Sequence, residues 1–448
     1  MKSFIKYLSF ALVCLLIFGL VACSMDDTLE ESDTETESVQ DTAEDERDTE
    51  TERVEDESES DTEDDGDSGE ADENKETFIM LNSEATFLKL LDGRQEFTAN
   101  GITCDFSCAG IEFEAQCEGD ITVGVAVSSS TGCYFRAYVD GVEWKNGDSP
   151  YYECLTGAKQ IILKDIPAGK HTIRIVKATG YTLARTTLTS IRLESGAPIA
   201  AAPADNDLYI EYIGDSIFCG WGVVKTAWGA YNGTYQSQDG TLAIPYLVSG
   251  ELDADYSVVA VSGQGVVYGK PNIENAYKYA SYDRDCTVEY GFERKADVVV
   301  VNVGTNDYSH RDSVSAEQFS EAYTRMLRYV REKNGEDCII LVTYNMMNDC
   351  YGSEIVEVIS SLGGAENNYY VVKSERCGAV NSSHPSAEEN VKYAKVIGDT
   401  IKAIMDNSYT DTDQDTDKDT ENENVEPLIE LGSSMAENDI PATPWKED

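Results

Sequence analysis

Residues 297–307 read Asp-Val-Val-Val-Val-Asn-Val-Gly-Thr-Asn-Asp, a β-branched run that stops at a glycine and a group of polar residues. An apolar run without polar alternation is typical of a strand that is buried on both faces, as in a parallel sheet. Gly304 and the residues after it predict a turn where that strand ends. Polar side chains in this position are expected at the edge of a parallel sheet where ligands bind.

Four more apolar runs of similar length lie on either side of this stretch. They are Leu208–Ile213, Tyr256–Val261, Cys338–Thr343 and Asn368–Val372. The segments between the runs are long enough for helices, and residues 319–330 place apolar side chains at helical spacing behind a capping box of Ser315 and Gln318. Strands that alternate with helices predict a three-layer α/β domain with a parallel sheet, which we assign to residues 207–406.

Upstream of that domain, residues 77–197 show short runs in which apolar and polar residues alternate. The runs are Ile111–Ala115, Ile121–Val125, Tyr134–Val139, His171–Ile175 and Leu188–Leu193, with turns expected at Asp140-Gly141 and at Ala168–Lys170. Many strands without helices predict a jelly-roll-like β-sandwich. Two roles stay open for it: binding of sugar, or packing and spacing alone. Alanines and prolines predict a linker over residues 198–206.

The negative charge is concentrated in two flanking segments. Of the formal net charge of −50, residues 23–76 carry −24 and residues 407–448 carry −11. Both segments are poor in apolar side chains that would offset the entropy of ordering, so we predict a disordered acidic tether and a disordered acidic tail. The remaining chain is acidic as well, and it would repel phosphates. Nucleic acid is therefore excluded as an expected partner.

The first 22 residues predict an export signal. Lys2 and Lys6 precede an apolar stretch, Leu8–Val21, that is too short to cross a bilayer and leads through small residues to Cys23. This arrangement resembles the bacterial lipoprotein signal. The resemblance implies a lipid on Cys23, contact with the membrane through that lipid, and a place on the extracellular face of a bacterial membrane. A plain signal peptide or a membrane anchor is the alternative.

Cysteine and histidine spacing gives no sign of a metal site. The cysteines beyond the signal contain no Cys-x-x-Cys pair, and the three histidines, His171, His310 and His384, have no such pair at ligand spacing. We therefore predict no metal and no cofactor. An exported chain permits disulfides, but their pairing cannot be deduced from the spacing.

Three of the predicted strands are followed by residues that can take part in catalysis. Gly214-Asp215-Ser216 follows the first strand, Ser262–Gly265 the second and Gly304–Asp307 the third. A serine at a strand-to-helix turn can present its hydroxyl, while glycine N–H groups and an asparagine amide can donate hydrogen bonds to an oxyanion. Each segment alone also fits an ordinary helix cap or turn.

The fourth segment, Asn381–Ser386, contains His384 and lies between the last strand and a helix that begins with a capping box of Ser386 and Glu389. A lone histidine is more often an ordinary loop residue than a base. Its position after the last strand, however, predicts that His384 lies at the same edge of the sheet as Ser216.

These four segments, in this order, resemble the signature of the SGNH (GDSL-type) hydrolase family over residues 208–406. With the preceding β-sandwich, the layout is similar to carbohydrate esterase family two, which consists of acetyl esterases that act on xylan and other hemicelluloses. The resemblance implies that Ser216 is the nucleophile and His384 the general base. It also implies an oxyanion hole made of the Ser216 and Gly263 N–H groups and the Asn306 amide.

The chain departs from the family pattern at Asn381, which stands where the family has the acid of the triad. The amide oxygen of Asn381 can accept a hydrogen bond and orient the imidazole, but it cannot offer the charge that stabilises an imidazolium. We therefore expect a Ser–His dyad, with Asn381 as a candidate orienter only.

Aromatic residues gather after Ser216 and beside Asn306. Aromatic faces stack on sugar rings, so we name these residues as substrate-binding candidates. They are Trp221, Trp228, Tyr231, Tyr235 and Tyr308. Packing in the core is the competing explanation.

The expected function is that of a monomeric, lipid-anchored serine esterase that removes O-acetyl groups from plant cell-wall polysaccharide. Two alternatives stay open. The acyl substrate could be a lipid, a thioester or a peptidoglycan acetyl group. The substitution at Asn381 also fits a surface carbohydrate-binding protein whose hydrolase domain has weakened.

Overall fold

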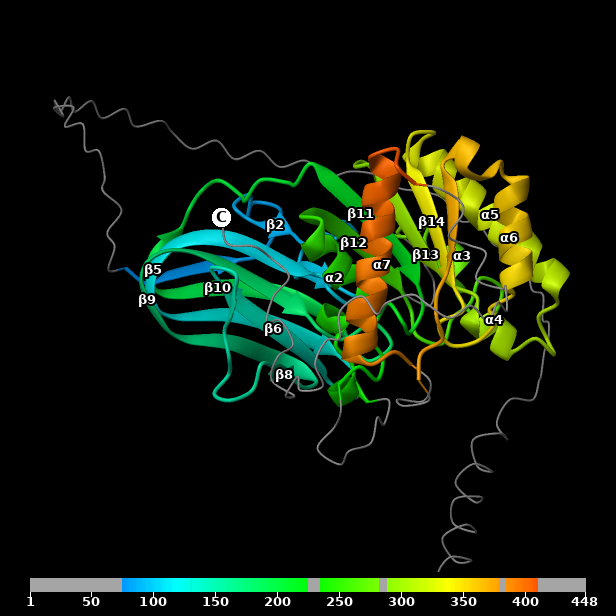
Figure 1. Cartoon of the computed structure of the whole chain (residues 1–448). Helices are drawn as coiled ribbons and strands as arrows, with labels where there is room; N and C mark the ends of the chain where they lie inside the picture. Colours follow the sequence, from blue (N-terminus) through cyan, green and yellow to red (C-terminus); the bar gives the residue numbers. More distant parts are fainter. Residues whose placement is uncertain (1–74, 130, 225–233, 282–287, 379–383, 410–448) are drawn as a thin grey trace, which may run out of the picture. The chain divides into compact units, whose positions relative to one another are not determined.

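The computed structural model describes residues 75–129, 131–224, 234–281, 288–378 and 384–409. These residues belong to one compact unit, Ser68–Asp448, in which strand pairing defines two β-sheets (Figure 1). The predicted export signal with Cys23, nearly all of the predicted acidic tether and acidic tail, and the candidates Trp228, Tyr231 and Asn381 lie outside the described residues.

The first sheet is antiparallel and consists of ten strands. They are β1 (Thr77–Met80), β2 (Lys89–Leu90), β3 (Phe97–Thr98), β4 (Gly101–Cys104), β5 (Gly110–Ser128), β6 (Cys133–Val139), β7 (Val142–Glu143), β8 (Tyr152–Cys154), β9 (Gly157–Lys177) and β10 (Arg185–Pro198). The main path is β3-β4-β10-β5-β9-β6-β7, while β1 pairs with β10, β2 with β5 and β8 with β6. Their buried side chains form a core of their own. The domain is therefore rich in sheet, and the β-sandwich stays a prediction.

The length of β5 and β9 differs from the prediction. The runs expected at residues 111–115 and 121–125 belong to one strand, and the turn expected at Ala168–Lys170 is wrong because these residues lie inside β9. The pairing of β5 with β9 shifts register on both sides of Gly119. Bulges absorb the irregular residues and bend a strand without ending it, which is why the sequence suggested breaks here.

The turn at Asp140-Gly141 is confirmed. The two residues join β6 to β7, with φ angles of 52° and 76°. Two successive positive φ angles are the signature of the tight hairpin turn that Asp-Gly favours.

The second sheet is parallel, as predicted. It contains β11 (Leu208–Gly214), β12 (Ala254–Ala260), β13 (Val298–Asn302), β14 (Ile339–Tyr344) and β15 (Tyr369–Lys373), in the order β12-β11-β13-β14-β15. Each strand overlaps a predicted apolar run, and both ends agree within one residue except at β12, which begins two residues before the predicted run. Because every strand runs the same way, their carboxyl ends share one edge of the sheet.

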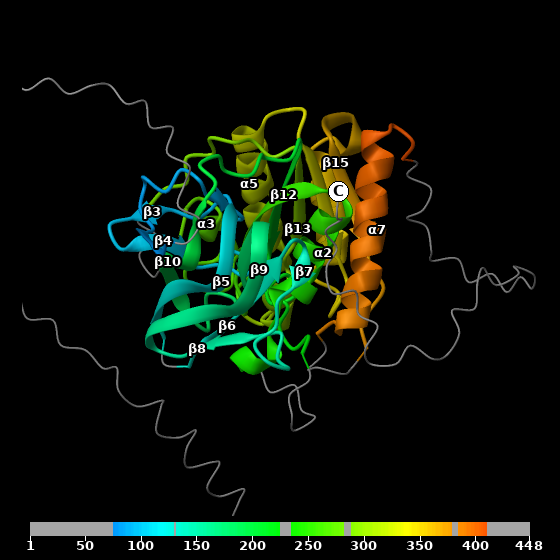
Figure 2. The same ribbon diagram turned by 90° about the vertical axis from the view of Figure 1, so that its left-hand side faces the viewer.

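Helices cover this sheet on both faces (Figures 1 and 2). The α-helices are α2 (Ile244–Glu251), α3 (Ile273–Ala276), α4 (Thr305–Ser309), α5 (Ala316–Asn334), α6 (Gly352–Ser361) and α7 (Ala387–Met405); short 3₁₀ turns are η1 (Tyr235–Ser237), η2 (Gly240–Leu242) and η3 (Gly364–Asn367). No helix in the described ranges is long and apolar enough to span a membrane.

Alternate valines of β13 point to opposite faces of the parallel sheet and pack against different helices. Val298 and Val300 pack in one cluster with apolar residues of α2 and α7. Val299 and Val301 pack in another with residues of α3, α5 and α6. Both predicted capping boxes are present, at the first residues of α5 and of α7.

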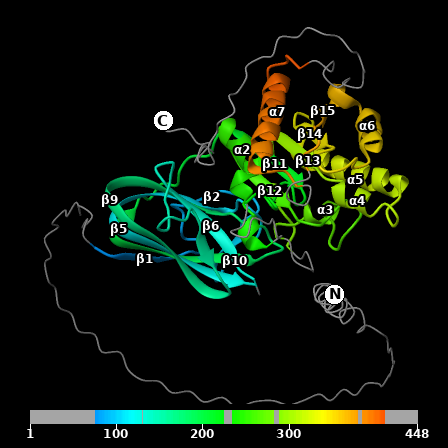
Figure 3. The same cartoon turned by 60° about the horizontal axis from the view of Figure 1, so that its bottom comes forward.

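The sheet-rich domain covers the free edge of the parallel sheet. After β2, Asp92 forms a parallel bridge with Tyr256 of the edge strand β12, so the chain continues alongside that strand (Figure 3). The Tyr256 hydroxyl donates to the carbonyl of Cys108 at 2.8 Å. Fully buried Arg94 donates to Glu211 of β11 at 3.1 Å. An exposed sheet edge invites pairing with other chains, and this contact covers the edge strand at Tyr256.

Candidate active site

Ser216 lies two residues beyond β11, at the carboxyl edge of the parallel sheet. The turn that carries it is held by Asp215, whose carboxylate accepts from the Ile217 N–H at 3.0 Å and whose carbonyl accepts from the Cys219 N–H at 3.2 Å. The ring of Phe218 packs where a side chain at position 214 would lie, so glycine is required there. Ser216 itself is 5% exposed.

His384 reaches Ser216 across 168 residues of sequence. Its Nε2 lies 2.7 Å from Ser216 Oγ. The position of the ring follows from α7, because the N-cap Ser386 begins that helix two residues later. A hydroxyl and an imidazole at hydrogen-bonding distance have the geometry of a nucleophile and its base.

Gly263 follows β12 in a tight turn at the same edge. The Gln264 N–H donates to the Val261 carbonyl at 3.2 Å, and Gly263 has a φ of 80°. A positive φ at the third residue of such a turn defines type II and favours glycine. A Cβ built on Gly263 would meet no atom within 4 Å, so the space beside it is open.

Asn306 is the second residue of α4 and connects three segments. Its side-chain Nδ2 donates to Asp215 Oδ2 at 3.1 Å and to the Gln264 carbonyl at 2.9 Å. Asn306 therefore ties the serine turn to the glycine turn. Its carbonyl is within 2.8 Å of Nδ1 of His310, a ring that stacks on Tyr268.

Two buried carboxyl groups lie behind this site, and the sequence reasoning gave neither of them a role. Burial raises the pKa of Asp215 to about 7, helped by the neighbouring charge of Asp307. Burial also raises the pKa of Asp307, although N–H groups of three backbone residues donate to it and oppose the shift. Both aspartates stand next to signature residues in the quoted motifs. Only the fold could reveal what they contact.

The described aromatic candidates lie in different surroundings. Trp221 is half-buried beyond Ser216. Tyr235 packs edge-on against Tyr134 of β6 and donates to Glu153 of β8 at 2.7 Å, so its contacts are with the sheet-rich domain. Such contacts are those expected of packing.

Tyr308 is placed differently, beside a cavity of about 450 Å³ at the carboxyl ends of β14 and β15. Its hydroxyl donates to Asp349 at 3.1 Å, and the half-buried ring lies under Arg311. Tyr344 and Tyr351 line the same cavity. Its aromatic and polar lining is of the kind that fits a sugar.

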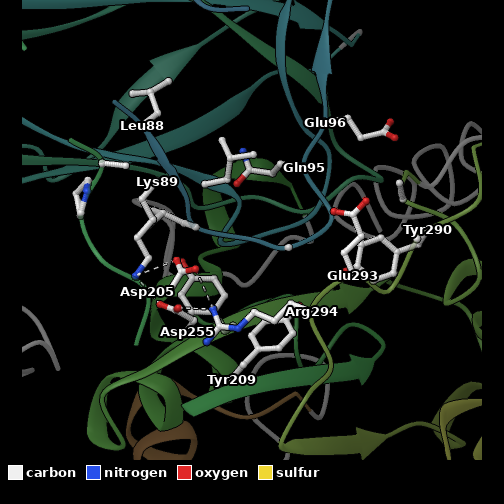
Figure 4. Close-up of a pocket in the computed structure, with 18 of the residues that line it drawn as sticks. Leu88, Lys89, Gln95, Glu96, Asp205, Tyr209, Asp255, Tyr290, Glu293 and Arg294 are labelled. Atoms are coloured by element: carbon white, nitrogen blue, oxygen red, sulfur yellow. Dashed lines mark hydrogen bonds and ion pairs between the residues drawn. The ribbon is translucent and has the colours of Figure 1, made fainter. Parts of the chain in front are cut away.

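A larger cavity, of about 600 Å³, lies at the opposite edge of the sheet (Figure 4). Tyr209 and Asp255, at the start of β11 and of β12, line it together with the segment around Lys89. Both of its cations are paired, because Asp255 bridges Lys89 at 2.7 Å and Arg294 at 2.5 Å. This cavity is not part of the serine site. Within the part of the chain that the structure describes, no cluster of His, Cys, Asp and Glu could hold a metal ion.

Two family models match the chain in succession. Residues 91–203 match the carbohydrate esterase 2 N-terminal family, and residues 212–409 match the GDSL-like lipase/acylhydrolase family. The boundary between the two matches falls where the chain passes from the antiparallel to the parallel sheet.

Two curated relatives cover much of the chain. A cellulase/esterase of Acetivibrio thermocellus is 26% identical over 66% of this chain and 37% of its own length. An acetylxylan esterase / glucomannan deacetylase of Cellvibrio japonicus is 22% identical over 52% of this chain and 70% of its own length. The chain thus spans little more than a third of the first relative and about two thirds of the second.

Solved structures share the fold. A family two carbohydrate esterase from Clostridium thermocellum in complex with cellohexaose has a TM-score of 0.63 at 24% identity, and covers 71% of this chain and 99% of its own. A family two carbohydrate esterase from Cellvibrio japonicus has a TM-score of 0.65 at 18% identity, over 74% and 98%. Sequence motifs, sheet order and both family models agree: the chain consists of a carbohydrate esterase 2 N-terminal domain followed by a GDSL-like (SGNH) lipase/acylhydrolase domain.

Proposed function

We propose that this protein is a serine esterase that removes O-acetyl groups from plant cell-wall polysaccharide, such as xylan or another hemicellulose. The observation that carries the proposal is the 2.7 Å contact between Ser216 Oγ and His384 Nε2 at the carboxyl edge of the parallel sheet. The named relatives support carbohydrate as the substrate class, since one is an acetylxylan esterase / glucomannan deacetylase.

The reaction would begin when Ser216 Oγ attacks the acetyl carbonyl carbon while His384 Nε2 takes the hydroxyl proton. The resulting oxyanion would accept hydrogen bonds from the Ser216 and Gly263 N–H groups. The Asn306 amide would join them by turning one N–H from the Gln264 carbonyl to the oxyanion.

Collapse of the tetrahedral intermediate would break the bond to the sugar oxygen, which takes the proton from His384. Water, deprotonated by the same imidazole, would then attack the acetyl-serine and release acetate. We keep the expectation of a Ser–His dyad. Asn381, the candidate orienter, lies outside the described residues.

We infer that the sugar chain extends from Ser216 past Tyr308 and over the 450 Å³ cavity beside it. The half-buried tyrosine and the mixed aromatic and polar lining support this path. Trp221 is the other described candidate for sugar contact, whereas the contacts of Tyr235 with Tyr134 and Glu153 favour packing.

We further propose that the protein is exported and held at the outer face of a bacterial membrane by lipid on Cys23, with the acidic segment as a tether. The signal-like sequence of residues 1–23 supports this. We also infer a β-sandwich for residues 77–197, because β5 and β9 carry the bulges that let long strands bend.

Acetate release tests the activity. The full-length protein should release acetate from acetylated xylan and from an aryl acetate, and Ser216→Ala should lower kcat by about 10⁴-fold or more. Aryl esters of increasing acyl length separate an acetyl esterase, which should prefer the shortest, from a lipase. Polysaccharide binding without acetate release would instead favour a binding protein. Turnover in Ser216→Ala equal to that of wild type would refute the proposal.

A further inference from the structure

The carboxylate of Asp307 is bound by backbone N–H groups of three successive residues. Oδ2 accepts from Val266 at 2.8 Å, and Oδ1 accepts from Val267 at 2.8 Å and from Tyr268 at 2.9 Å. Asp307 is completely buried. Successive backbone N–H groups that converge on one anion form a nest, and here the anion is a side chain of the protein itself.

Gly265 makes room for this carboxylate. A Cβ at Gly265 would overlap both carboxylate oxygens of Asp307. The Gly265 N–H donates to the Tyr268 carbonyl at 2.8 Å, which closes the nest into a compact loop. The glycine is thus explained by the position of the aspartate rather than by a positive φ.

The same loop begins with the Gly263 turn. Within that turn the Gln264 N–H donates to the Val261 carbonyl at 3.2 Å, at the long end of the normal range. In the resting enzyme, Asn306 donates to the Gln264 carbonyl at 2.9 Å, and Asp307 accepts from the three residues after Gly265. When Asn306 turns one N–H to the oxyanion, the three hydrogen bonds to Asp307 still hold the loop.

We propose that Asp307 is a positioning residue for the oxyanion hole: its carboxylate fixes residues 266–268 and so sets where the Gly263 N–H points. The proposal rests on the serine esterase function proposed above. An oxyanion hole depends on donors that are already in place when charge develops, so a displacement of a few tenths of an ångström lowers kcat more than it changes KM.

Asp307→Asn tests the hydrogen bonds of this carboxylate without changing the size of the side chain. Asp307→Asn keeps size and shape but presents an NH₂ group to at least one of the three N–H donors, which repels it. Asp92→Asn is the matched control. Asp92 is also completely buried and accepts backbone N–H groups, from Arg94 at 2.9 Å and from Val258, in the middle of the outer strand β12, at 3.5 Å.

In the full-length protein, Asp307→Asn should lower kcat for p-nitrophenyl acetate by about 10- to 100-fold with little change in KM. The affinity for phenylboronic acid, which forms a tetrahedral adduct with an active-site serine, should fall by a similar factor. Labelling of Ser216 by a fluorophosphonate should slow as well. Asp92→Asn should leave all three quantities within about twofold of wild type.

Gly265→Ala is a second variant, because its methyl group displaces the same carboxylate, and it should reproduce the kinetic pattern. A folded Asp307→Asn protein with unchanged kcat and boronic acid affinity overturns the inference. So does an equal loss in Asp92→Asn, or a failure of both loop variants to fold, since Asp307 would then serve stability alone. If wild type labels with fluorophosphonate but releases no acetate, the proposed substrate fails while the labelling rates still decide the role of Asp307.

Discussion

At the scale of single residues, Gly263 can be compared with a glycine that has a similar φ angle but no proposed catalytic role. Gly263 and Gly141 have nearly equal φ angles, 80° and 76°, and a Cβ at either would meet no atom within 4 Å. Alanine should therefore strain both turns to the same extent, at a cost of about 1 kcal/mol in the free energy of unfolding.

The two substitutions should differ in activity. Gly263→Ala should lower both the melting temperature and kcat for p-nitrophenyl acetate, because the strained turn redirects its N–H. Gly141→Ala, in the hairpin between β6 and β7, should lower the melting temperature by a similar amount and leave kcat unchanged. Calorimetry and steady-state kinetics measure both. Equal kcat values for the two variants would show that the Gly263 N–H is not part of the site.

Asp215 predicts a pH dependence of stability. Burial raises its pKa to about 7, against about 3.9 in an unfolded chain, so between these values the folded protein binds more protons than the unfolded one. The contribution of Asp215 to the free energy of unfolding should therefore decrease as pH rises from about 4 to about 7 and then level off.

Replacing Asp215 with asparagine removes the loss of stability that comes from ionising this buried carboxyl group. Relative to wild type, Asp215→Asn should gain stability as pH rises from about 4 to about 7, even if its changed hydrogen bonds lower the absolute value. Asp312→Asn, at an exposed position, is the control and should follow the wild-type profile. Thermal melts at a series of pH values give the comparison. A constant offset between Asp215→Asn and wild type would contradict the raised pKa.

At the scale of elements, the residue that caps α7, Ser386, lies two residues after the proposed catalytic base His384. The Ser386 side chain accepts from the Glu389 N–H, and the Glu389 carboxylate accepts from the Ser386 N–H and, at 2.7 Å, from the Gly378 N–H. The Glu389 carboxylate thus joins Gly378 to Ser386, and His384 lies in the segment between these two residues. Ser315 forms an equivalent box on α5, which carries none of the proposed catalytic residues.

Removing either cap should cost about 1 kcal/mol of stability. Ser386→Ala should also lower kcat, because the cap fixes the loop that carries His384, whereas Ser315→Ala should leave kcat unchanged. Melting temperatures and aryl acetate kinetics test the pair. Full activity in Ser386→Ala would mean that other contacts hold the imidazole.

Elements with a strong local signal were predictable from the sequence. The five parallel strands appear as apolar runs because both of their faces are buried, and the capping boxes appear because they need only residues three positions apart. The bulged strands β5 and β9 were split or interrupted in the prediction, because glycine at a bulge looks like glycine at a turn. The roles of Asn306 and Asp307 depend on partners about 40 residues away, which no local pattern encodes.

At the scale of the whole molecule, the two domains share a buried ion pair. Arg94, from the sheet-rich domain, donates to Glu211 of β11 at 3.1 Å, and neither side chain is more than 1% exposed. Its other terminal nitrogen donates to the Tyr277 carbonyl at 2.8 Å, and its guanidinium lies 3.7 Å from the ring centre of Tyr290. The hydrolase domain therefore buries a carboxylate whose cation comes from the other domain.

Breaking this pair should be far more costly than breaking an exposed one. Arg94→Met leaves Glu211 buried without a cation and should lower the free energy of unfolding by about 3–5 kcal/mol. Arg192→Met, which removes an exposed pair with Glu76, should have a much smaller effect because water screens that pair. Adding Glu211→Gln to Arg94→Met should recover part of the loss, since the uncompensated charge is gone. Urea unfolding of the four proteins measures this, and a small effect of Arg94→Met would mean that the hydrolase domain tolerates the carboxylate alone and does not depend on its neighbour.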